Sequence, residues 1–265
     1  MDLEIRDSFL ERWGRFFPGA ELPIAFHYAD FPSDDSERVQ RSERRYCVFA
    51  DLNRVRHGTS LAFRNESVAC FGGRRYLGFA QEIRPDFEYF LSCGIPGKLE
   101  GERYKQTPEL VRGLVAAMPG FTAPNAWAIF KRWDHLGVND TPQVVVFFAV
   151  PDVLSGLFTL ANFDETELDG VIAPMGSGCS SIVMHPYLQG QAPRPRAVLG
   201  LFDPSARACA PPDVLTFAVP MAKFERMVAN MDESFLITET WKQMLARMAR
   251  RIETDRTQPR GDVGP

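Results

Sequence analysis

A continuous run of β-branched and aromatic residues constrains the fold more than any other feature of this chain. The segment QVVVFFAV occupies residues 143–150 and has no polar side chain after Gln143. Such a run is typical of a strand that is covered on both faces. Pro151 and Asp152 end the run and favour a helix directly after it. We therefore expect a sheet with this strand near its centre and helices packed against it.

The remaining periodic segments supply helices and further strands in mixed order. Apolar residues at helical spacing predict helices, and short alternating runs bounded by turn residues predict strands. The expected helices cover residues 2–17, 44–55, 72–83, 107–118, 153–163, 180–188, 223–231 and 238–252, and the expected strands cover 22–28, 59–64, 196–202 and 214–220. Residues 93–142 are rich in glycine and proline and outside 107–118 show no clear period, which predicts a surface excursion. This order lacks a regular βαβ alternation and predicts an α+β fold with a mixed sheet.

The chain is expected to form one compact domain over residues 1–253, with a disordered tail over 254–265. Two halves, 20–90 and 143–235, show a weak similarity. In the first half Cys47 precedes an apolar segment, a strand and SVAC, which ends at Cys70; in the second half Cys179 precedes an apolar segment, a strand and ARAC, which ends at Cys209. The separations differ, at 23 residues (47 to 70) and 30 residues (179 to 209). An internal duplication is one interpretation of this pattern, and chance similarity of short apolar segments is the other.

Composition excludes several classes of protein. The formal net charge is -4 and the isoelectric point is near 5.7, which argues against a nucleic-acid binder. No segment approaches the about 20 uninterrupted apolar residues that a membrane span needs. The acidic N-terminal stretch does not have the pattern of a signal peptide. Five cysteines without a C-x-x-C pair do not form a secreted disulfide framework, so we expect a cytoplasmic, reduced protein.

The segment CFGGRRYLGF, residues 70–79, is the first candidate site. Gly72 and Gly73 permit backbone conformations in which amide groups converge on an anion, and Arg74 would add positive charge. The spacing matches neither the dinucleotide-binding fingerprint nor the P-loop. A tight turn with Cys70 packed inside the protein explains the same residues without a ligand.

Cys179 in MGSGCSSIVMHPYL is the second candidate. It follows Ser177 and Gly178 at the expected start of a helix, where the pKa of a thiol is lowered. His185 lies six positions further on, about 240° around a helix, and cannot serve Cys179 as a base. A catalytic role for Cys179 therefore depends on a base that the sequence does not identify.

Distant cysteines suggest a metal centre as a third candidate. Cys47, Cys70 and Cys179 supply three thiols, and Cys93 or a histidine would be the fourth ligand of a zinc ion or an iron–sulfur cluster. Strong metal motifs have closely spaced ligand pairs, which are absent here. Scattered cysteines that pack in the core are the alternative.

Several segments, taken in order, resemble the uncharacterised ArCR family, a prokaryotic group of unknown function. The segments are YCVFADLNRV, CFGGRRYLGF, PQVVVFFAVPDVL, SGCSSIVMHPY and LTFAVPMAKFERM, which lie within residues 20–235. The resemblance implies a single compact domain and makes Cys70 and Cys179 stronger site candidates. It implies no reaction, and Cys93 and Cys209 do not match its segments.

Together these features predict a protein that binds a small anionic or redox-active ligand in a cleft near Cys70 and Cys179. The ligand-binding residues would be Cys70, Gly72, Gly73, Arg74 and Cys179. A cysteine-ligated metal or iron–sulfur protein is the first alternative, and a cysteine-dependent enzyme that uses Cys179 is the second. We expect no nucleic-acid or membrane partner.

Overall fold

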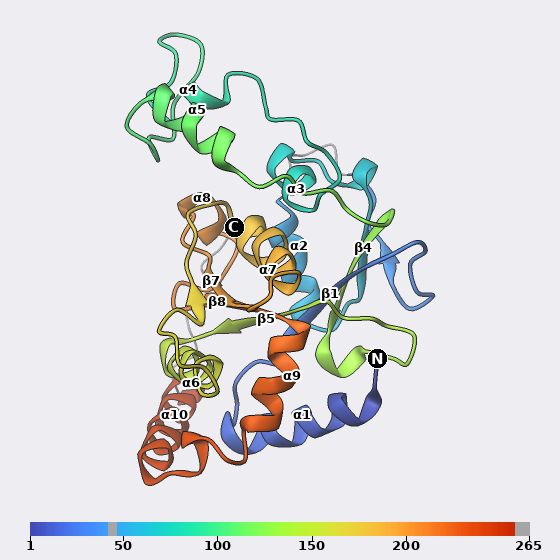
Figure 1. Ribbon diagram of the computed structural model, residues 1–265, viewed down its shortest axis with the longest axis vertical. Helices are drawn as coiled ribbons and strands as arrows, with labels where there is room; N and C mark the ends of the chain where they lie inside the picture. Colours follow the sequence, from blue (N-terminus) through green and yellow to red (C-terminus); the bar gives the residue numbers. More distant parts are fainter. Residues whose placement is uncertain (42–46, 258–265) are drawn as a thin grey trace.

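A mixed sheet of eight strands separates two layers of helices (Figure 1). The structure is a computed structural model that describes residues 1–41 and 47–257. Along the sheet the strands follow the order β2-β3-β4-β1-β5-β8-β7-β6. Their bounds are β1 Ile24–Ala29, β2 Glu37–Arg38, β3 Leu61–Phe63, β4 Trp127–Arg132, β5 Val144–Ala149, β6 Val171–Ile172, β7 Ala197–Gly200 and β8 Leu215–Pro220. The predicted α+β class with a mixed sheet is confirmed.

Strand β5 lies near the centre of the sheet and is buried on both faces, as its apolar run predicts. Val144, Val146 and Phe148 join the hydrophobic core on one face. Val145 and Phe147 join the core on the other face. Successive side chains of a strand point to opposite faces, so a strand between two cores must be apolar throughout.

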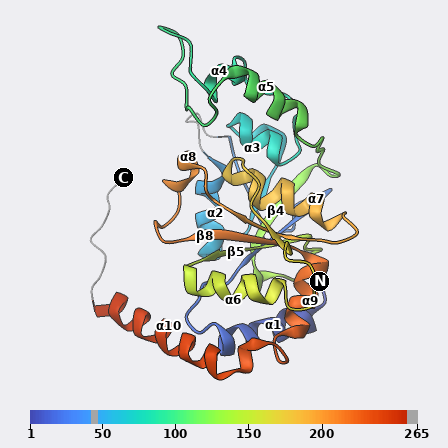
Figure 2. The same cartoon turned by 60° about the vertical axis from the view of Figure 1, so that its left-hand side comes forward.

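One helical layer, which we call the upper layer, contains the helices that follow the candidate cysteines. It consists of α2 (Val48–Arg56), α3 (Phe71–Tyr76), the π-helical segment η3 (Ser180–Met184), α7 (His185–Gly190) and α8 (Pro204–Arg207). Figure 2 shows the sheet nearly edge-on with this layer above it. Val48, Phe49, Leu52 and Val55 form the buried stripe of α2 against the sheet.

The opposite, lower layer contains the longest helices. It consists of α1 (Leu3–Phe16), α6 (Pro151–Ala161), α9 (Met221–Asn230) and α10 (Glu239–Thr257). Phe9, Trp13 and Phe16 form the buried stripe of α1, and the Asp2 side chain caps its first turn by accepting from the Glu4 amide. Stacked and edge-on aromatic pairs, such as Phe9 against Trp133, fill this core.

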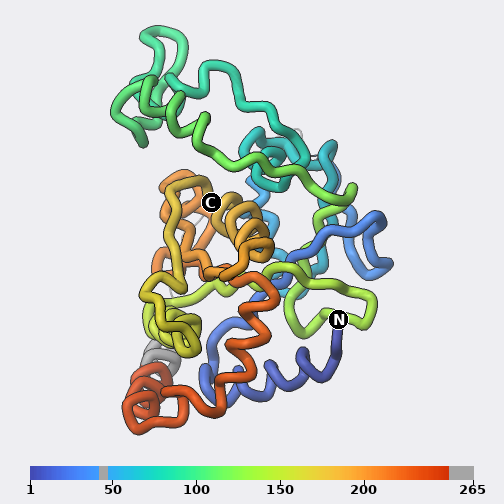
Figure 3. The backbone as a smooth tube through the Cα atoms, in the orientation of Figure 1, coloured from blue at the N-terminus to red at the C-terminus, as the bar shows by residue number. Residues whose placement is uncertain are grey.

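A surface excursion leaves the upper layer between α3 and β4. Residues 84–120, which we call the arm, contain the short helix α4 (Phe87–Phe90) and the helix α5 (Pro108–Ala117). The tube in Figure 3 shows the arm extending beyond the helices that cover the sheet. Thr107 caps α5 by accepting from the Leu110 amide, as the Thr-Pro start of the segment predicts.

Several elements differ from the sequence expectation, including the short strands β2 and β6 and the short helices α4 and α8, which were not predicted. Strand β4 lies inside the supposedly irregular segment 93–142 and pairs along its whole length with β1. Helix α3 ends at Tyr76, because Gly78 adopts a φ of 74° that stops the helix early. Helix α10 continues to Thr257, so residues 254–257 are helical where a tail was expected, and residues 258–265 lie outside the described part of the chain.

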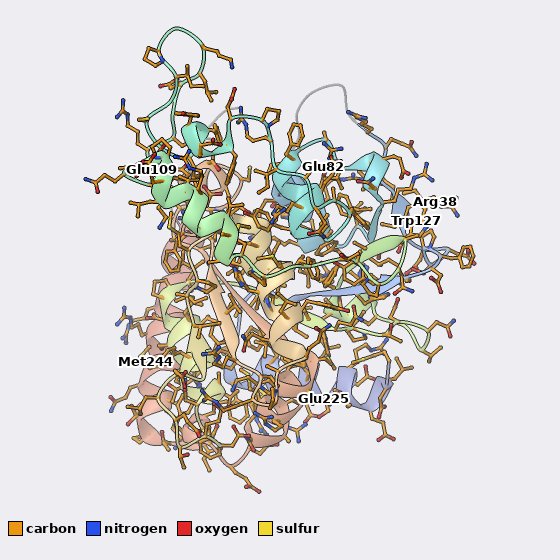
Figure 4. All side chains as sticks on the ribbon, turned by 45° about the horizontal axis from the view of Figure 1, so that its top comes forward. Arg38, Glu82, Glu109, Trp127, Glu225 and Met244 are labelled. Atoms are coloured by element: carbon orange, nitrogen blue, oxygen red, sulfur yellow. The ribbon has the colours of Figure 1, made fainter. Side chains whose placement is uncertain are left out.

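The two-residue strand β2 forms one edge of the sheet. Arg38 of β2 lies beside Trp127 of β4 at the rim (Figure 4), with its guanidinium carbon 5.8 Å from the centre of the ring. The labelled Glu109 and Met244 mark the arm and α10 in the same view. Within residues 1–41 and 47–257, no helix is both long enough and apolar enough to cross a bilayer.

Candidate thiol site

The fold brings four of the five cysteines together in the upper layer. Cys179 is part of the hydrophobic core beneath this layer, and Cys47, Cys70 and Cys209 pack against the same core. All five cysteines of the chain are free thiols. We refer to Cys47, Cys70, Cys179 and Cys209 as the thiol site.

Cys47 lies at the centre of the site, at the N-terminus of α2. Hydrogen bonding with the Cys179 thiol lowers the pKa of Cys47 to about 6. The backbone N–H groups of Phe49 and Ala50, in the first turn of α2, lie near the sulfur and act in the same direction without completing a capping hydrogen bond. A helix N-terminus stabilises a negative charge in this way. Among these cysteines Cys47 has the environment that favours a thiolate.

Cys179 lies at the start of the π-helical segment η3, with 5% of its surface exposed. Its hydrogen bond with Cys47 raises the pKa of Cys179 well above the usual value, and burial acts in the same direction. A thiol that keeps its proton is a poor nucleophile. These opposite pKa shifts favour Cys47 over Cys179 as the reactive sulfur, although the sequence had pointed to Cys179.

Cys70 caps the short helix α3. Its sulfur accepts a hydrogen bond from the Gly73 amide at 3.1 Å. Burial raises the pKa of the Cys70 thiol, and the neighbouring Cys47 contributes in the same direction. Cys70 therefore belongs to the thiol site as well as to the turn into α3.

Cys209 follows α8 and completes the group. Burial raises the pKa of its thiol, and both the charge of Cys47 and a hydrogen bond with Cys47 add to the shift. Sequence reasoning did not include Cys209 among the candidate ligands. The signal that could have identified it was the similarity between SVAC at residues 67–70 and ARAC at residues 206–209.

The other predicted ligand residues do not form an open anion site. Gly72 and Gly73 lie inside α3 rather than in a left-handed turn, and the Gly73 amide is already bonded to Cys70. The Arg74 guanidinium carbon lies 4.9 Å from the centre of the Phe71 ring, and Arg74 Nε is buried without a hydrogen-bond partner. Gly73 serves close packing, because there is no room for a side chain at this position.

Negative charge and phenols surround the thiols. Asp203, the N-cap of α8, acts to raise the pKa of Cys47 and Cys179. Burial raises the pKa of Tyr76, and Cys179 and Asp203 act in the same direction. Tyr104 of the arm lies near the same carboxylate. Desolvation is the larger cause that raises the pKa of Tyr104, and the charge of Asp203 raises it further. The arm therefore reaches the edge of the thiol site.

Cys93 does not join the group. It is exposed, and the hydrogen bonds described for its sulfur involve its sequence neighbours Ser92 and Gly94. It lines a hollow formed by the loop at residues 93–103. In the described residues no interaction connects Cys93 with the other four cysteines, so it is a poor candidate for a shared ligand.

The histidines also lie apart from the thiols in the interactions that the structure describes. His27 Nε2 lies 3.5 Å from Asp140, His57 contacts the Asn53 carbonyl, and His135 contacts Arg132. Burial lowers the pKa of His185. Within residues 1–41 and 47–257, no described interaction joins a histidine to these thiols.

The thiol site does not have the geometry of a metal site. Among the described residues, no group of three or more Cys, His, Asp or Glu side chains is arranged to hold a metal ion. A separate cavity of about 260 Å³ lies at the C-terminal end of β5 and is lined by residues from both faces of the sheet, among them Trp13, Arg56 and Asp152. It is not lined by any of the four cysteines.

Comparison of the sequence with models of known families finds a match to one family. The model of a family described as "Uncharacterised ArCR" matches residues 20–230. The chain belongs to the DUF169 family. The DUF169 match includes all eight strands and all four cysteines of the thiol site, and it leaves out α1 and α10. No curated protein and no solved structure matches the chain.

DUF169 membership confirms the resemblance noted from the sequence and assigns no activity. Any function must therefore be inferred from the residues of the site itself.

Proposed function

We propose that this DUF169 protein binds a small thiophilic or redox-active ligand at the thiol site. The observation that carries the proposal is the convergence of four free thiols, supplied by four separate elements, around Cys47. Packing alone requires no sulfur at these positions. A small apolar residue such as alanine can also occupy a core position, whereas sulfur adds affinity for soft ligands and reversible redox chemistry.

The anionic ligand that the sequence suggested has less support. The Gly73 amide, which would have bound an anion, is already bonded to Cys70, and Asp203 adds negative charge at the site. Four sulfurs beside a carboxylate favour a cationic or electrophilic ligand instead. A soft ligand that accepts electron pairs from sulfur fits these residues better than phosphate or carboxylate.

An enzyme that uses Cys179 as its nucleophile remains the alternative function. It has less support, because Cys179 is buried and its thiol retains its proton beside Cys47. Cys47 is the better placed nucleophile if covalent chemistry occurs at the site.

A trivalent arsenical that bridges neighbouring thiols tests the proposal. Phenylarsine oxide reacts with two thiols to form two arsenic–sulfur bonds and releases one water molecule. We expect the reduced, metal-free protein to bind one arsenical, with Cys47 and one of its neighbours in the adduct. Intact-mass and peptide mass spectrometry measure both the stoichiometry and the sites.

Two serine variants provide the comparison. Cys47→Ser should strongly diminish the bridged adduct, because Cys47 influences the pKa of each of the other three thiols. Cys93→Ser should leave it unchanged, because Cys93 is exposed. Absence of a bridged adduct in the wild-type protein, or an undiminished adduct in Cys47→Ser, would overturn the proposal.

A further inference from the structure

The cavity at the C-terminal end of β5 is built by both helical layers. Helices α1, α6 and α10 of the lower layer supply Trp13, Asp152 and Met248, and α2 of the upper layer supplies Arg56. Figure 2 shows α1, α6 and α10 together below the sheet. Trp13 and Met248 lie outside the DUF169 match, so the cavity includes parts of the chain that the match does not cover.

Aromatic and aliphatic side chains form much of the cavity wall. Phe147 and Phe148 are adjacent in β5 and belong to opposite faces of the sheet, yet both line the cavity. Val153, Val214 and Met248 add aliphatic surface. An apolar cavity of about 150 Å³ can hold benzene. The volume of about 260 Å³ is therefore enough for a molecule of about two fused rings.

Trp13 contributes a hydrogen-bond donor that has no partner among the described residues. The residue is 3% exposed, and its Nε1 is buried and unpaired. The two other buried tryptophans are satisfied, because Trp133 donates to the Arg6 carbonyl at 3.2 Å and Trp241 donates to the Phe16 carbonyl at 3.0 Å. An unpaired buried donor is unfavourable, and a ligand that offers it an acceptor removes that cost.

Two buried charged side chains also line the cavity, and each has a partner of opposite charge. Arg56 donates to Glu21 through Nε at 2.6 Å and Nη2 at 2.7 Å, and to Asn53 through Nη1 at 3.3 Å. A guanidinium has five N–H donors, so these bonds leave two for a ligand. Asp152 pairs through Oδ2 with Arg247 Nε at 3.0 Å. The wall thus offers hydrogen bonds from neutralised groups.

We infer that this cavity binds a small, uncharged aromatic molecule that carries a hydrogen-bond acceptor and a donor, as an aromatic amide does. Its carbonyl would accept from Trp13 or Arg56, and its N–H would donate to the Asp152 carboxylate. Its rings would pack against Phe147 and Phe148, since aromatic pairs are favourable in stacked and edge-on contact. The inference does not depend on the thiol site, because no cysteine lines the cavity.

The charges around the cavity favour an uncharged ligand. The carboxylates of Glu21, Asp152 and Asp213 line the cavity together with one arginine, an arrangement that repels an anion. A cation also lacks an open place. The Arg56 guanidinium carbon already lies 4.6 Å from the centre of the Phe148 ring, and Asp152 already has a cationic partner.

Three naphthalene derivatives of similar size test the inference. At neutral pH, 2-naphthamide is uncharged, 2-naphthoate is an anion and 2-naphthylmethylamine is a cation. Each is titrated into the nitrogen-15-labelled full-length protein, and the indole N–H signals of the four tryptophans are followed by NMR. We expect 2-naphthamide to shift the Trp13 signal saturably and to bind at least about tenfold more tightly than either charged probe.

Two phenylalanine variants make the test specific for Trp13. Trp13→Phe keeps an aromatic ring but removes the unpaired N–H, and should weaken binding of 2-naphthamide by about threefold to tenfold. The missing signal in its spectrum also assigns Trp13. Trp133→Phe is the matched control, because it removes an indole from the same core at a position that does not line the cavity, and it should bind as the wild type does. Far-ultraviolet circular dichroism shows that both variants retain the fold.

Each failure has a distinct meaning. If no probe shifts the Trp13 signal of the wild-type protein saturably, the cavity holds only water and the inference is overturned. Tighter binding of either charged probe would overturn the uncharged class of ligand. Equal weakening in Trp13→Phe and Trp133→Phe would overturn the role of the Trp13 donor. Cys47→Ser should bind 2-naphthamide as the wild type does, so this result is separate from the outcome at the thiol site.

Discussion

Gly73 is the most tightly packed position beside the thiols. A Cβ atom at this residue would lie 2.7 Å from the Cys70 sulfur, 2.8 Å from a Val68 methyl and 2.9 Å from a Val48 methyl. All three neighbours are anchored in the core or at the cap of α3. The absence of a side chain at Gly73 therefore allows α3 to approach α2 closely enough to bring Cys70 beside Cys47.

We expect Gly73→Ala to destabilise the protein by about 1–3 kcal/mol, the range for overpacked cores. Gly72→Ala in the same helix is the control, because a Cβ there would meet only Tyr76, at an ordinary 3.7 Å. Urea denaturation of both variants measures the free energy of unfolding. Equal stabilities of the two variants would contradict the packing argument.

His27 should give the protein a pH-dependent stability. Burial lowers its pKa from 6.5 to about 4; Asp140 opposes this shift, while Lys131 and the N-terminal ammonium reinforce it. The unfolded chain therefore takes up a proton at higher pH than the folded protein does. The resulting stability is present above pH 6.5 and is lost as the pH falls toward 4, by about 3 kcal/mol in total.

His27→Gln should remove this component of the pH dependence, whereas His57→Gln, at an exposed histidine, should retain it. Unfolding by urea at a series of pH values from 7 to 4 measures the difference between variant and wild type. Carboxylates also titrate in this range, so the comparison uses the difference between the curves rather than either curve alone. Parallel curves for the wild type and His27→Gln would contradict the prediction.

At the scale of the elements, Trp241 joins helix α10 to the other helices of the lower layer. This residue is 3% exposed, and its indole N–H donates to the Phe16 carbonyl at 3.0 Å. Its ring packs edge-on against Phe17 and Phe235. One side chain thus joins the last helix to the end of the first.

Trp241→Ala should destabilise the protein by about 3–5 kcal/mol, since it removes a large buried aromatic group. Trp241→Phe should cost less, about 1–3 kcal/mol for leaving the Phe16 carbonyl without its donor. Gln243→Ala, at an exposed position of the same helix, should change the stability by less than about 0.5 kcal/mol. Chemical denaturation measures all three, and equal effects of Trp241→Ala and Gln243→Ala would refute the assigned role.

Local patterns predicted most elements, and the exceptions have identifiable causes. The apolar run of β5 and the periodic helices α1, α5 and α9 could be predicted because each pattern is local. Strand β4 was missed because WAIFKR carries Lys131 and Arg132. Lys131 is 2% exposed and bonds to Asp35 and Asp140, partners that only the tertiary structure provides.

The candidate site was predictable only in part for a similar reason. The sequence singled out Cys47, Cys70 and Cys179, but it gave no means of choosing a fourth residue. Which cysteines meet is decided by the strand order, with β3 and β7 placed symmetrically about the β1–β5 pair. Cys93 is closer to Cys70 in the sequence than Cys209 is, yet the arm keeps it out of the group.

At the scale of the whole molecule, both cores span the central pair of strands. Residues from both halves occur in each hydrophobic core, for example Phe26 with Val198 on one face and Ala25 with Phe217 on the other. Neither half therefore has a core of its own. We consequently expect the two halves to unfold together in one cooperative transition.

We predict one unfolding transition in urea for residues 1–257, with coincident curves from tryptophan fluorescence and far-ultraviolet circular dichroism. Trp13, Trp133 and Trp241 are buried in the lower core and report on tertiary packing. Circular dichroism reports on the helices of both layers. Two separated transitions would show that the halves fold independently.

The seam between β1 and β5 has a consequence for any attempt to produce one half alone. A fragment that contains only one of these two strands would expose the backbone donors and acceptors that now join Ile24, Ala25 and Phe26 to their partners in β5. The freed strand would be hydrophobic and unprotected, which is the kind of edge along which polypeptides aggregate. An isolated half should consequently be insoluble or self-associate, with a second copy of itself in the place of its missing neighbour.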